Sequence, residues 1–127
     1  MASKRFSFWA DDPKALEKLI EQTLRGEKTA TARPAFSWGK PKHDFDDARF
    51  AVGDICDLYD AHRHRRGRIT ITDVYKCRLG AIPDKLWRDE ACVDARQFVD
   101  GHKWGWGHLP IDDDFKMYGI HYRLERD

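Results

Sequence analysis

The stretch GEKTATAR, residues 26–33, joins the end of one predicted element to the start of the next. Gly26 stands where a helix-ending residue in the left-handed conformation is expected. The small and β-branched residues that follow favour an extended strand, and Pro34 pushes Arg33 toward extended geometry as well. The ammonium of Lys28 therefore leaves the chain at a rigid junction, and two hydroxyls and a guanidinium follow at once.

On a regular strand, alternate side chains of this stretch point to opposite faces. Lys28 would share one face with two alanines, whose small size leaves room for a ligand cleft. Thr31 would lie on the other face with Thr29 and Arg33. A ligand site that uses both Lys28 and Thr31 therefore requires Lys28 to precede the strand proper, or a local twist. The alternative is an ordinary edge strand whose polar residues face water.

The residues before this stretch predict a helix over about 13–25 and a short strand over 5–9. Asp12 can cap the helix N-terminus, and Pro13 suits the first helical position, where a missing N–H costs nothing. The spacing of the core-forming residues is helical. The residues on this helical face are Ala15, Leu16, Leu19, Ile20, Thr23 and Leu24.

Residues 34–52 lack clear periodicity, and a loop of this length in a small domain is usually functional or mobile. The rest of the chain predicts alternating strands, turns and short helices, which is an α+β organisation with a mostly antiparallel sheet or small barrel. We expect a turn at 52–54, strands at 55–59, 68–77 and 117–124, a hairpin tip near 65–67, a β-bulge near 73–75, and helices at 82–90 and 94–103.

The length of 127 residues predicts a single domain, residues 1–127, that can bury a core. A hydrophobic content of 41% excludes a disordered chain. No apolar run reaches the roughly 18 residues that cross a bilayer, and no signal-peptide core follows residues 1–5, so we expect neither a membrane span nor secretion. Three cysteines without C-x-x-C spacing argue against a disulfide scaffold or Cys-rich zinc site and favour the cytoplasm.

The net charge of +1 hides an uneven distribution. Residues 25–42 and 60–78 together carry +8, and the remainder carries −7. If the fold brings the two segments together, they form a basic surface suited to phosphate or nucleic acid. The alternative is two solvated loops.

No motif for metal, nucleotide or serine-nucleophile chemistry is present. His62 and His64 would share one face of a strand, which allows a metal pair, but the surrounding arginines disfavour a cation. We therefore expect no metal and no cofactor.

Most of the tryptophans are expected in the core, whereas Trp38 lies in the long basic loop and is a candidate for base stacking. We expect His102 to hydrogen-bond within its helical region and His121 to lie on the more polar face of the last strand. The tryptophans expected in the core are Trp9, Trp87 and Trp104.

The sequence resembles the ASCH domain (activating signal cointegrator homology), a family similar to the PUA domains of RNA-modifying enzymes. The G-x-K-T-x-T-x-R string of residues 26–33 is the most specific feature, and Phe8-Trp9, the first helix and residues 52–54 match as well. The resemblance covers nearly the whole chain. It implies a small, mostly antiparallel β-barrel of PUA-like type, flanked by two or three helices, with a cleft open to RNA or a nucleoside. Weaker matches are Ile71–Val74, Asp89–Glu90 and the spacing of Phe98, His102 and Trp104.

Some members of this family are similar to amidohydrolases that remove the acetyl group from N4-acetylcytidine with a Lys, a Thr and a Glu. The resemblance assigns these roles to Lys28 and Thr31 through the K-x-x-T string, and to Glu90 through spacing across a helix. Amide hydrolysis needs a nucleophile, a proton donor and a charge for the oxyanion. Thr31 would attack or position a water, Lys28 would act as base or oxyanion partner, and Glu90 would shuttle the proton to N4.

Other members of the family bind RNA or are ribonucleases, so a binding module or a metal-independent ribonuclease is the alternative. In that class the long loop and the tip at 63–68 would supply stacking and phosphate contacts. The near-zero net charge favours the small-ligand enzyme over a protein that grips long RNA. The expected partner is RNA or a modified nucleoside, and a monomer is compatible with the sequence. The candidate binding residues are Thr29, Arg33, Trp38, Lys40, Lys42, Arg63, Arg65 and Arg66.

Overall fold

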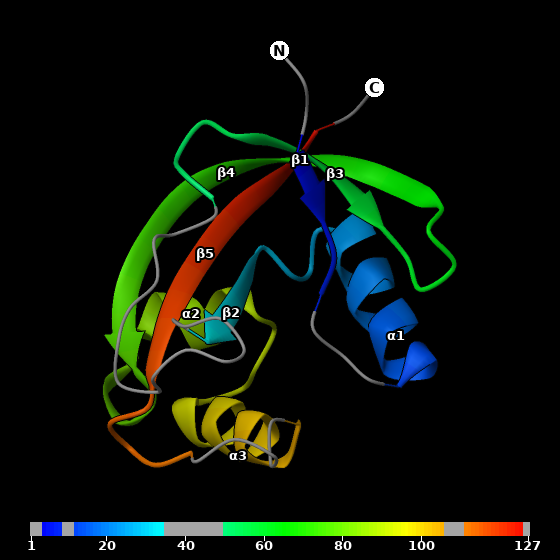
Figure 1. Ribbon diagram of the computed structural model, residues 1–127. Coiled ribbons are helices and arrows are strands. Elements are labelled where there is room, and N and C mark those ends of the chain that lie inside the picture. Colours follow the sequence, from blue (N-terminus) through cyan, green and yellow to red (C-terminus); the bar gives the residue numbers. More distant parts are fainter. Residues whose placement is uncertain (1–3, 9–11, 35–49, 106–110, 126–127) are drawn as a thin grey trace, which may run out of the picture.

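A computed structural model describes residues 4–8, 12–34, 50–105 and 111–125 of the chain. The strands form a five-stranded sheet in the order β1-β3-β4-β5-β2. Figure 1 shows β4 and β5 running side by side as the long, curved centre of this sheet. The strands are β1 (Lys4–Phe6), β2 (Ala30–Pro34), β3 (Ile55–Tyr59), β4 (Arg65–Arg78) and β5 (Lys116–Glu125).

The sheet is open, which corrects the expectation of a barrel, whereas the mostly antiparallel pairing is present in three of the four described strand pairs. β1 pairs with β3 in parallel, whereas the other strand pairs are antiparallel. Within the described ranges, β1 and β2 stand at opposite ends of the strand order and do not close on each other. The direction of β1 is set by a pairing with a distant strand, which no local sequence pattern specifies. The α+β class is confirmed.

The helix α1 (Pro13–Leu24) has the ends that the sequence predicts. The backbone of Asp12 is extended, and its side chain accepts a hydrogen bond from the helical backbone two residues on. Gly26 has a φ of +79°, and the N–H of Glu27 donates to the carbonyl of Gln22 at 2.9 Å. These are the features of a Schellman motif, so the chain leaves α1 in one fixed direction.

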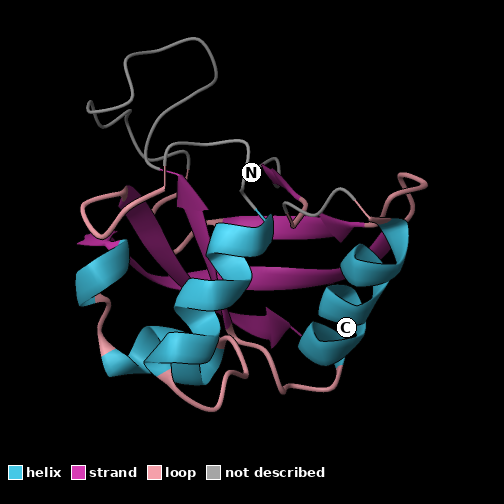
Figure 2. Ribbon diagram, turned by 90° about the horizontal axis from the view of Figure 1, so that it is seen from below, coloured by secondary structure: helices cyan, strands magenta, loops and turns pink. Residues whose placement is uncertain are grey.

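The remaining helices are η1 (Leu79–Ala81), α2 (Asp84–Asp89) and α3 (Ala95–Gly105). In the view of Figure 2 the helices lie in front of the strands. In the described part of the chain, no helix is long and apolar enough to cross a membrane.

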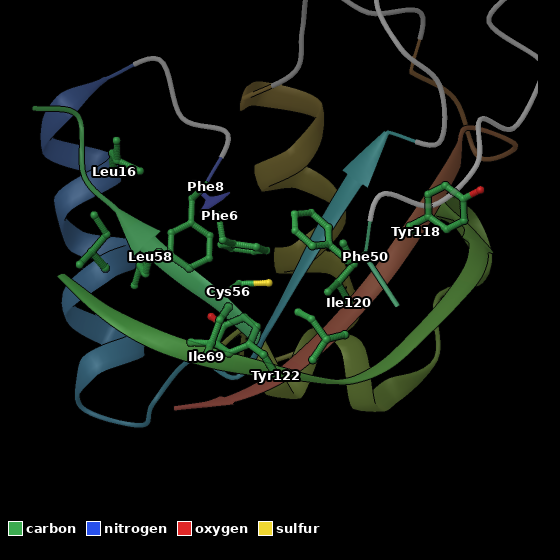
Figure 3. Packing of buried hydrophobic residues seen from close by; sticks show 12 residues of the cluster. Phe6, Phe8, Leu16, Phe50, Cys56, Leu58, Ile69, Tyr118, Ile120 and Tyr122 are labelled. Atoms are coloured by element: carbon green, nitrogen blue, oxygen red, sulfur yellow. The ribbon is translucent and has the colours of Figure 1, made fainter. Parts of the chain in front are cut away.

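Two groups of buried side chains form the core. In the first, α1 packs on the sheet through Leu16 and Ile20. Figure 3 shows the rings of Phe6, Phe8 and Tyr122 gathered there, and the ring centroids of Phe6 and Phe8 lie 5.3 Å apart at 84°. The second group joins α2 and α3 to β2 and β5. Its buried members are Ala30, Ala32, Leu79, Leu86, Phe98, Phe115 and Met117.

The predicted turn and bulge are both present. Gly53 has a φ of +94°, and the N–H of Asp54 donates to the carbonyl of Ala51 at 3.0 Å. The pairing of β4 with β5 shifts register between Ile71 and Asp73, which confirms a bulge close to the predicted position.

Two expectations about single residues are wrong. Trp104 is 88% exposed in the last turn of α3 instead of buried in the core. His121 is 5% exposed, and the consecutive residues Met117–Tyr122 of β5 are all buried, so both faces of this part of the strand are covered. For a strand that is buried on both faces, the alternation of polar and apolar residues does not predict which side chains face solvent. Trp87 packs against the second core group, and Trp9 lies outside the described residues.

Candidate functional site

A cavity of about 230 Å³ lies where β2, the end of α2 and one face of α3 meet. The three residues to which the family resemblance assigns catalysis, Lys28, Thr31 and Glu90, all line it. Its volume is below the range of pockets that hold drug-sized molecules, and it suits a nucleobase with a small substituent. The other lining residues are Phe8, Leu19, Ala32, Cys92, Gln97, Phe98, Gly101 and His102.

Lys28 reaches this cavity because it precedes the strand. β2 begins at Ala30, so the alternation of a regular strand does not apply to Lys28, and Lys28 and Thr31 line the same cavity. The Lys28 side chain is fully buried, and Nζ donates to the carbonyl of Ala30 at 2.6 Å and to Oε1 of Glu90 at 2.9 Å. The junction that the sequence predicts thus brings a charged group into the interior.

The Lys28–Glu90 pair is a desolvated ion pair with short contacts. Exposure of the side chains is 1% for Lys28 and 9% for Glu90. The ammonium also lies 5.3 Å from the centroid of the Phe8 ring, a favourable cation–π distance. An ammonium has three N–H donors, and the hydrogen bonds described above use two of them. One N–H is therefore available to an oxygen of a ligand.

Glu90 is also held by a helix end. It is the residue that ends α2, and Ala91 follows with a φ of +63°. The N–H of Cys92 donates to the carbonyl of Trp87 at 2.9 Å, which completes a second Schellman motif with alanine at the left-handed position. Lys28 thus lies four residues after the last residue of α1, and Glu90 lies directly after the last residue of α2.

His102 enters the cavity from α3. Its Nδ1 lies 2.7 Å from the carbonyl oxygen of Phe98, which confirms the expected hydrogen bond within this helical region. The ring stacks on Phe98 with centroids 4.0 Å apart at 27°. Its Nε2 lies 3.8 Å from Oε2 of Glu90. The sequence offers no local signal for this proximity, because the two residues lie on different helices.

A second network fixes α2 against the sheet. The carbonyl of Asp89 accepts from the N–H of Thr29 at 2.7 Å, and Nδ1 of His121 donates to the Asp89 carboxylate at 2.9 Å. The Tyr75 hydroxyl lies 2.8 Å from Nε2 of His121, and burial raises the pKa of this hydroxyl. Because Asp89 precedes Glu90, these contacts hold Glu90 at a fixed distance from Lys28. Sequence reasoning did not find His121 and Tyr75.

Two other candidate binding residues, Thr29 and Arg33, do not line the cavity. Thr29 contributes backbone hydrogen bonds that join α2 to the sheet. Arg33 donates to the carbonyl of Ser7, and its guanidinium lies 5.0 Å from the centroid of the Phe6 ring. Trp38, Lys40 and Lys42 lie outside the described residues.

The arginines of the central hairpin are largely paired with acidic side chains. Arg65 donates to Asp57 at 3.0 Å, and Arg66 donates to Glu17 at 2.6 Å. Arg63 is exposed in the turn before β4. None of these three arginines lines the cavity. The positive charge of this segment is thus partly neutralised in the fold.

The cysteines behave as thiols in this structure. Burial raises the pKa of Cys56 to about 11 and raises the pKa of Cys92, which lines the cavity. Cys92 is therefore protonated at neutral pH and a poor nucleophile. Among the described residues, no group of three or more His, Cys, Asp and Glu side chains is placed to hold a metal ion.

Solved structures with this fold include ASCH domains. The ASCH domain of Lactobacillus crispatus JV V101 superposes with a TM-score of 0.76 at 19% identity, over 97% of this chain and 79% of that chain. A DUF984 protein from Enterococcus faecalis V583 gives a TM-score of 0.74 at 13% identity, over 98% and 80%. The ASCH protein of Zymomonas mobilis gives 0.57 at 11% identity, over 94% and 65%. No family model and no curated protein matches the sequence. The resemblance to ASCH domains is confirmed at the level of the fold.

Proposed function

We propose that this chain, which has the ASCH-domain fold, is an amidohydrolase that removes the acyl group from N4-acetylcytidine or a related N4-acylated cytosine. The observation that carries the proposal is the buried Lys28–Glu90 pair beside Thr31 in one cavity. Burying two charges is costly, and a structural role alone is served as well by apolar residues. A buried ion pair that lines a cavity is therefore a candidate for chemistry.

In the proposed reaction the three side chains act on one amide. The ammonium of Lys28 stabilises the oxyanion that forms when the acyl carbonyl is attacked, through the N–H donor that the pair leaves available. The hydroxyl of Thr31 attacks the carbonyl or positions the attacking water. Glu90 accepts the proton that the attacking oxygen loses and shuttles it toward N4.

The shape and walls of the cavity support a planar ligand. Phe8 and Phe98 supply aromatic side chains, and Leu19 and Ala32 supply apolar ones. Single bases are commonly bound by stacking on aromatic rings. A volume of about 230 Å³ suits a base and its acyl group better than a folded oligonucleotide, so the free nucleoside is the substrate we propose first.

The experiment is hydrolysis of N4-acetylcytidine by the purified protein, with cytidine and acetate measured by chromatography. Lys28→Ala and Thr31→Ala should each lower the rate at least about 10²-fold, the scale of losing one catalytic group. The exposed residues Lys85 and Thr72 provide the matched controls Lys85→Ala and Thr72→Ala, whose rates should equal that of the wild type. Full activity in a folded Lys28→Ala protein would refute the proposal.

A second candidate function is RNA binding without hydrolysis, and Trp104 is the observation in its favour. Trp104 is exposed and follows the cavity-lining Gln97 by seven residues, about two helical turns, so both share one face of α3. An exposed tryptophan beside a cavity suits stacking of a second base. This function predicts RNA affinity that falls with salt and with Trp104→Ala. Cleavage of labelled RNA without metal would indicate a ribonuclease instead.

A further inference from the structure

One oxygen of Glu90 lacks the partner that a buried carboxylate requires. Oε1 accepts from Lys28, but Oε2 is buried and has no hydrogen-bond partner in the described part of the chain. An unsatisfied buried acceptor costs free energy, more so when it is charged. Because Oε2 belongs to a residue that lines the cavity, a proton-bearing group of a ligand is a suitable partner for it.

His102 is fixed opposite this oxygen. The carbonyl of Phe98 only accepts hydrogen bonds, so Nδ1 of His102 carries a proton and donates it. Stacking on Phe98 sets the plane of the ring. Nε2 then lies 3.8 Å from Oε2 of Glu90, which is too long for a direct hydrogen bond. A ligand nitrogen placed beside this gap can lie within hydrogen-bond distance of both atoms.

We propose that His102 is a further catalytic residue, whose ring in its imidazolium form delivers from Nε2 the proton that the leaving nitrogen of the amide needs. This inference rests on the proposed amidohydrolase function. In the bound substrate, the amide N–H donates to Oε2 of Glu90, and Nε2–H of His102 lies against the same nitrogen. Glu90 and His102 thus divide between them the two proton transfers of the reaction.

The proposed steps balance as follows. A water positioned by the Thr31 hydroxyl forms the new C–O bond and loses a proton to Glu90. The carbonyl π electrons move to oxygen beside the Lys28 ammonium. When the C–N bond breaks, its electron pair stays on nitrogen, which takes the proton from Nε2 of His102. Proton transfer from Glu90 back to His102 restores both side chains, and the free acid loses its own proton to water.

The charged and titratable side chains around Nε2 come from the segments on either side. Glu90 faces it from the end of α2, Cys92 lines the cavity just after it, and Lys28 is paired with Glu90. Cys92 remains a thiol because burial raises its pKa, so it adds no charge. The proton on Nε2 is thus the one that the reaction consumes.

The substitution His102→Asn tests the proposal, because asparagine retains an N–H donor for the Phe98 carbonyl and lacks Nε2. We expect kcat for N4-acetylcytidine to fall about 10²-fold and KM to change less than about threefold. The penalty should shrink on N4-acetyl-5-fluorocytidine, whose leaving nitrogen is less basic. His62→Asn, at an exposed position of the hairpin turn, is the matched control.

The outcomes separate this inference from the proposed function. An active wild type with an equally active His102→Asn variant overturns the role of His102 and leaves the amidohydrolase in place. An equal loss on both substrates also overturns it, because a merely structural role has that signature. A wild type that releases no cytidine overturns the proposed function and this inference together.

Discussion

The buried Lys28–Glu90 pair should dominate the response of stability to mutation. In Lys28→Met, the methionine side chain has nearly the volume of the aliphatic part of lysine, so the packing against Phe8 changes little. Oε1 of Glu90 then loses the hydrogen bond that it accepts from Lys28, and Oε2 is already without a partner among the described residues. The substitution therefore leaves a buried charge with neither oxygen satisfied.

The magnitude follows from burial and geometry. With Glu90 only 9% exposed and its ion-pair distance at 2.9 Å, removing one partner should cost about 3–5 kcal/mol. A domain of this size is stable by roughly 5–15 kcal/mol, so the loss is a large part of the total. The double variant Lys28→Met/Glu90→Leu removes both charges and should recover most of the loss.

The assay is urea unfolding followed by far-UV circular dichroism, with the free energy of unfolding compared across the four proteins of the cycle. Lys18→Met, on the exposed face of α1, should change stability by no more than about 0.5 kcal/mol. A cost below about 1 kcal/mol for Lys28→Met, or a double variant less stable than the single one, would refute the view that this pair is desolvated.

Two further predictions concern other parts of the fold. Gly119→Ala should lower stability by about 1–3 kcal/mol, measured by thermal unfolding, because a Cβ there would lie 2.5 Å from the Tyr75 ring that His121 holds in place. The hydrogen bond from Lys4 holds the pKa of Asp54 below its usual 3.8, so this contact stabilises the fold at neutral pH and is lost as pH falls through the lowered pKa. Lys4→Met should therefore be less stable than the wild type at pH 7, and urea midpoints should converge in acid.

Local rules were sufficient wherever neighbouring residues determine the conformation. Asp12, Pro13 and Gly26 specify both ends of α1 through capping and backbone freedom, and the structure has those ends. The same stretch predicts that Lys28 precedes the strand proper if Lys28 and Thr31 act at one site. In the structure, β2 does begin at Ala30. The chemistry of the candidate site was therefore predictable in part from residues 26–33.

Contacts between distant segments were not predictable in this way. The parallel pairing of β1, the burial of His121 and the approach of His102 to Glu90 each depend on where a remote element packs. The sequence predicts Trp104 in the core because it lies on or beside an apolar face, yet its position on α3 is exposed to solvent. The charge count of the hairpin segment includes its arginines but not their acidic partners, because these partners lie on other segments.

The position of β5 constrains the order of events during biosynthesis. β5 lies between β4 and β2, although its residues, 116–125, follow those of every other strand in the described chain. While they are still inside the ribosome, β2 has no neighbour and β4 has one bare edge. The sheet cannot be completed in the order in which its strands are translated, because among the described strands β2 pairs only with β5, the last strand. The cavity between β2 and the helices is consequently completed only after β5 has been translated, and until then the edge of β4 that pairs with β5 stays exposed.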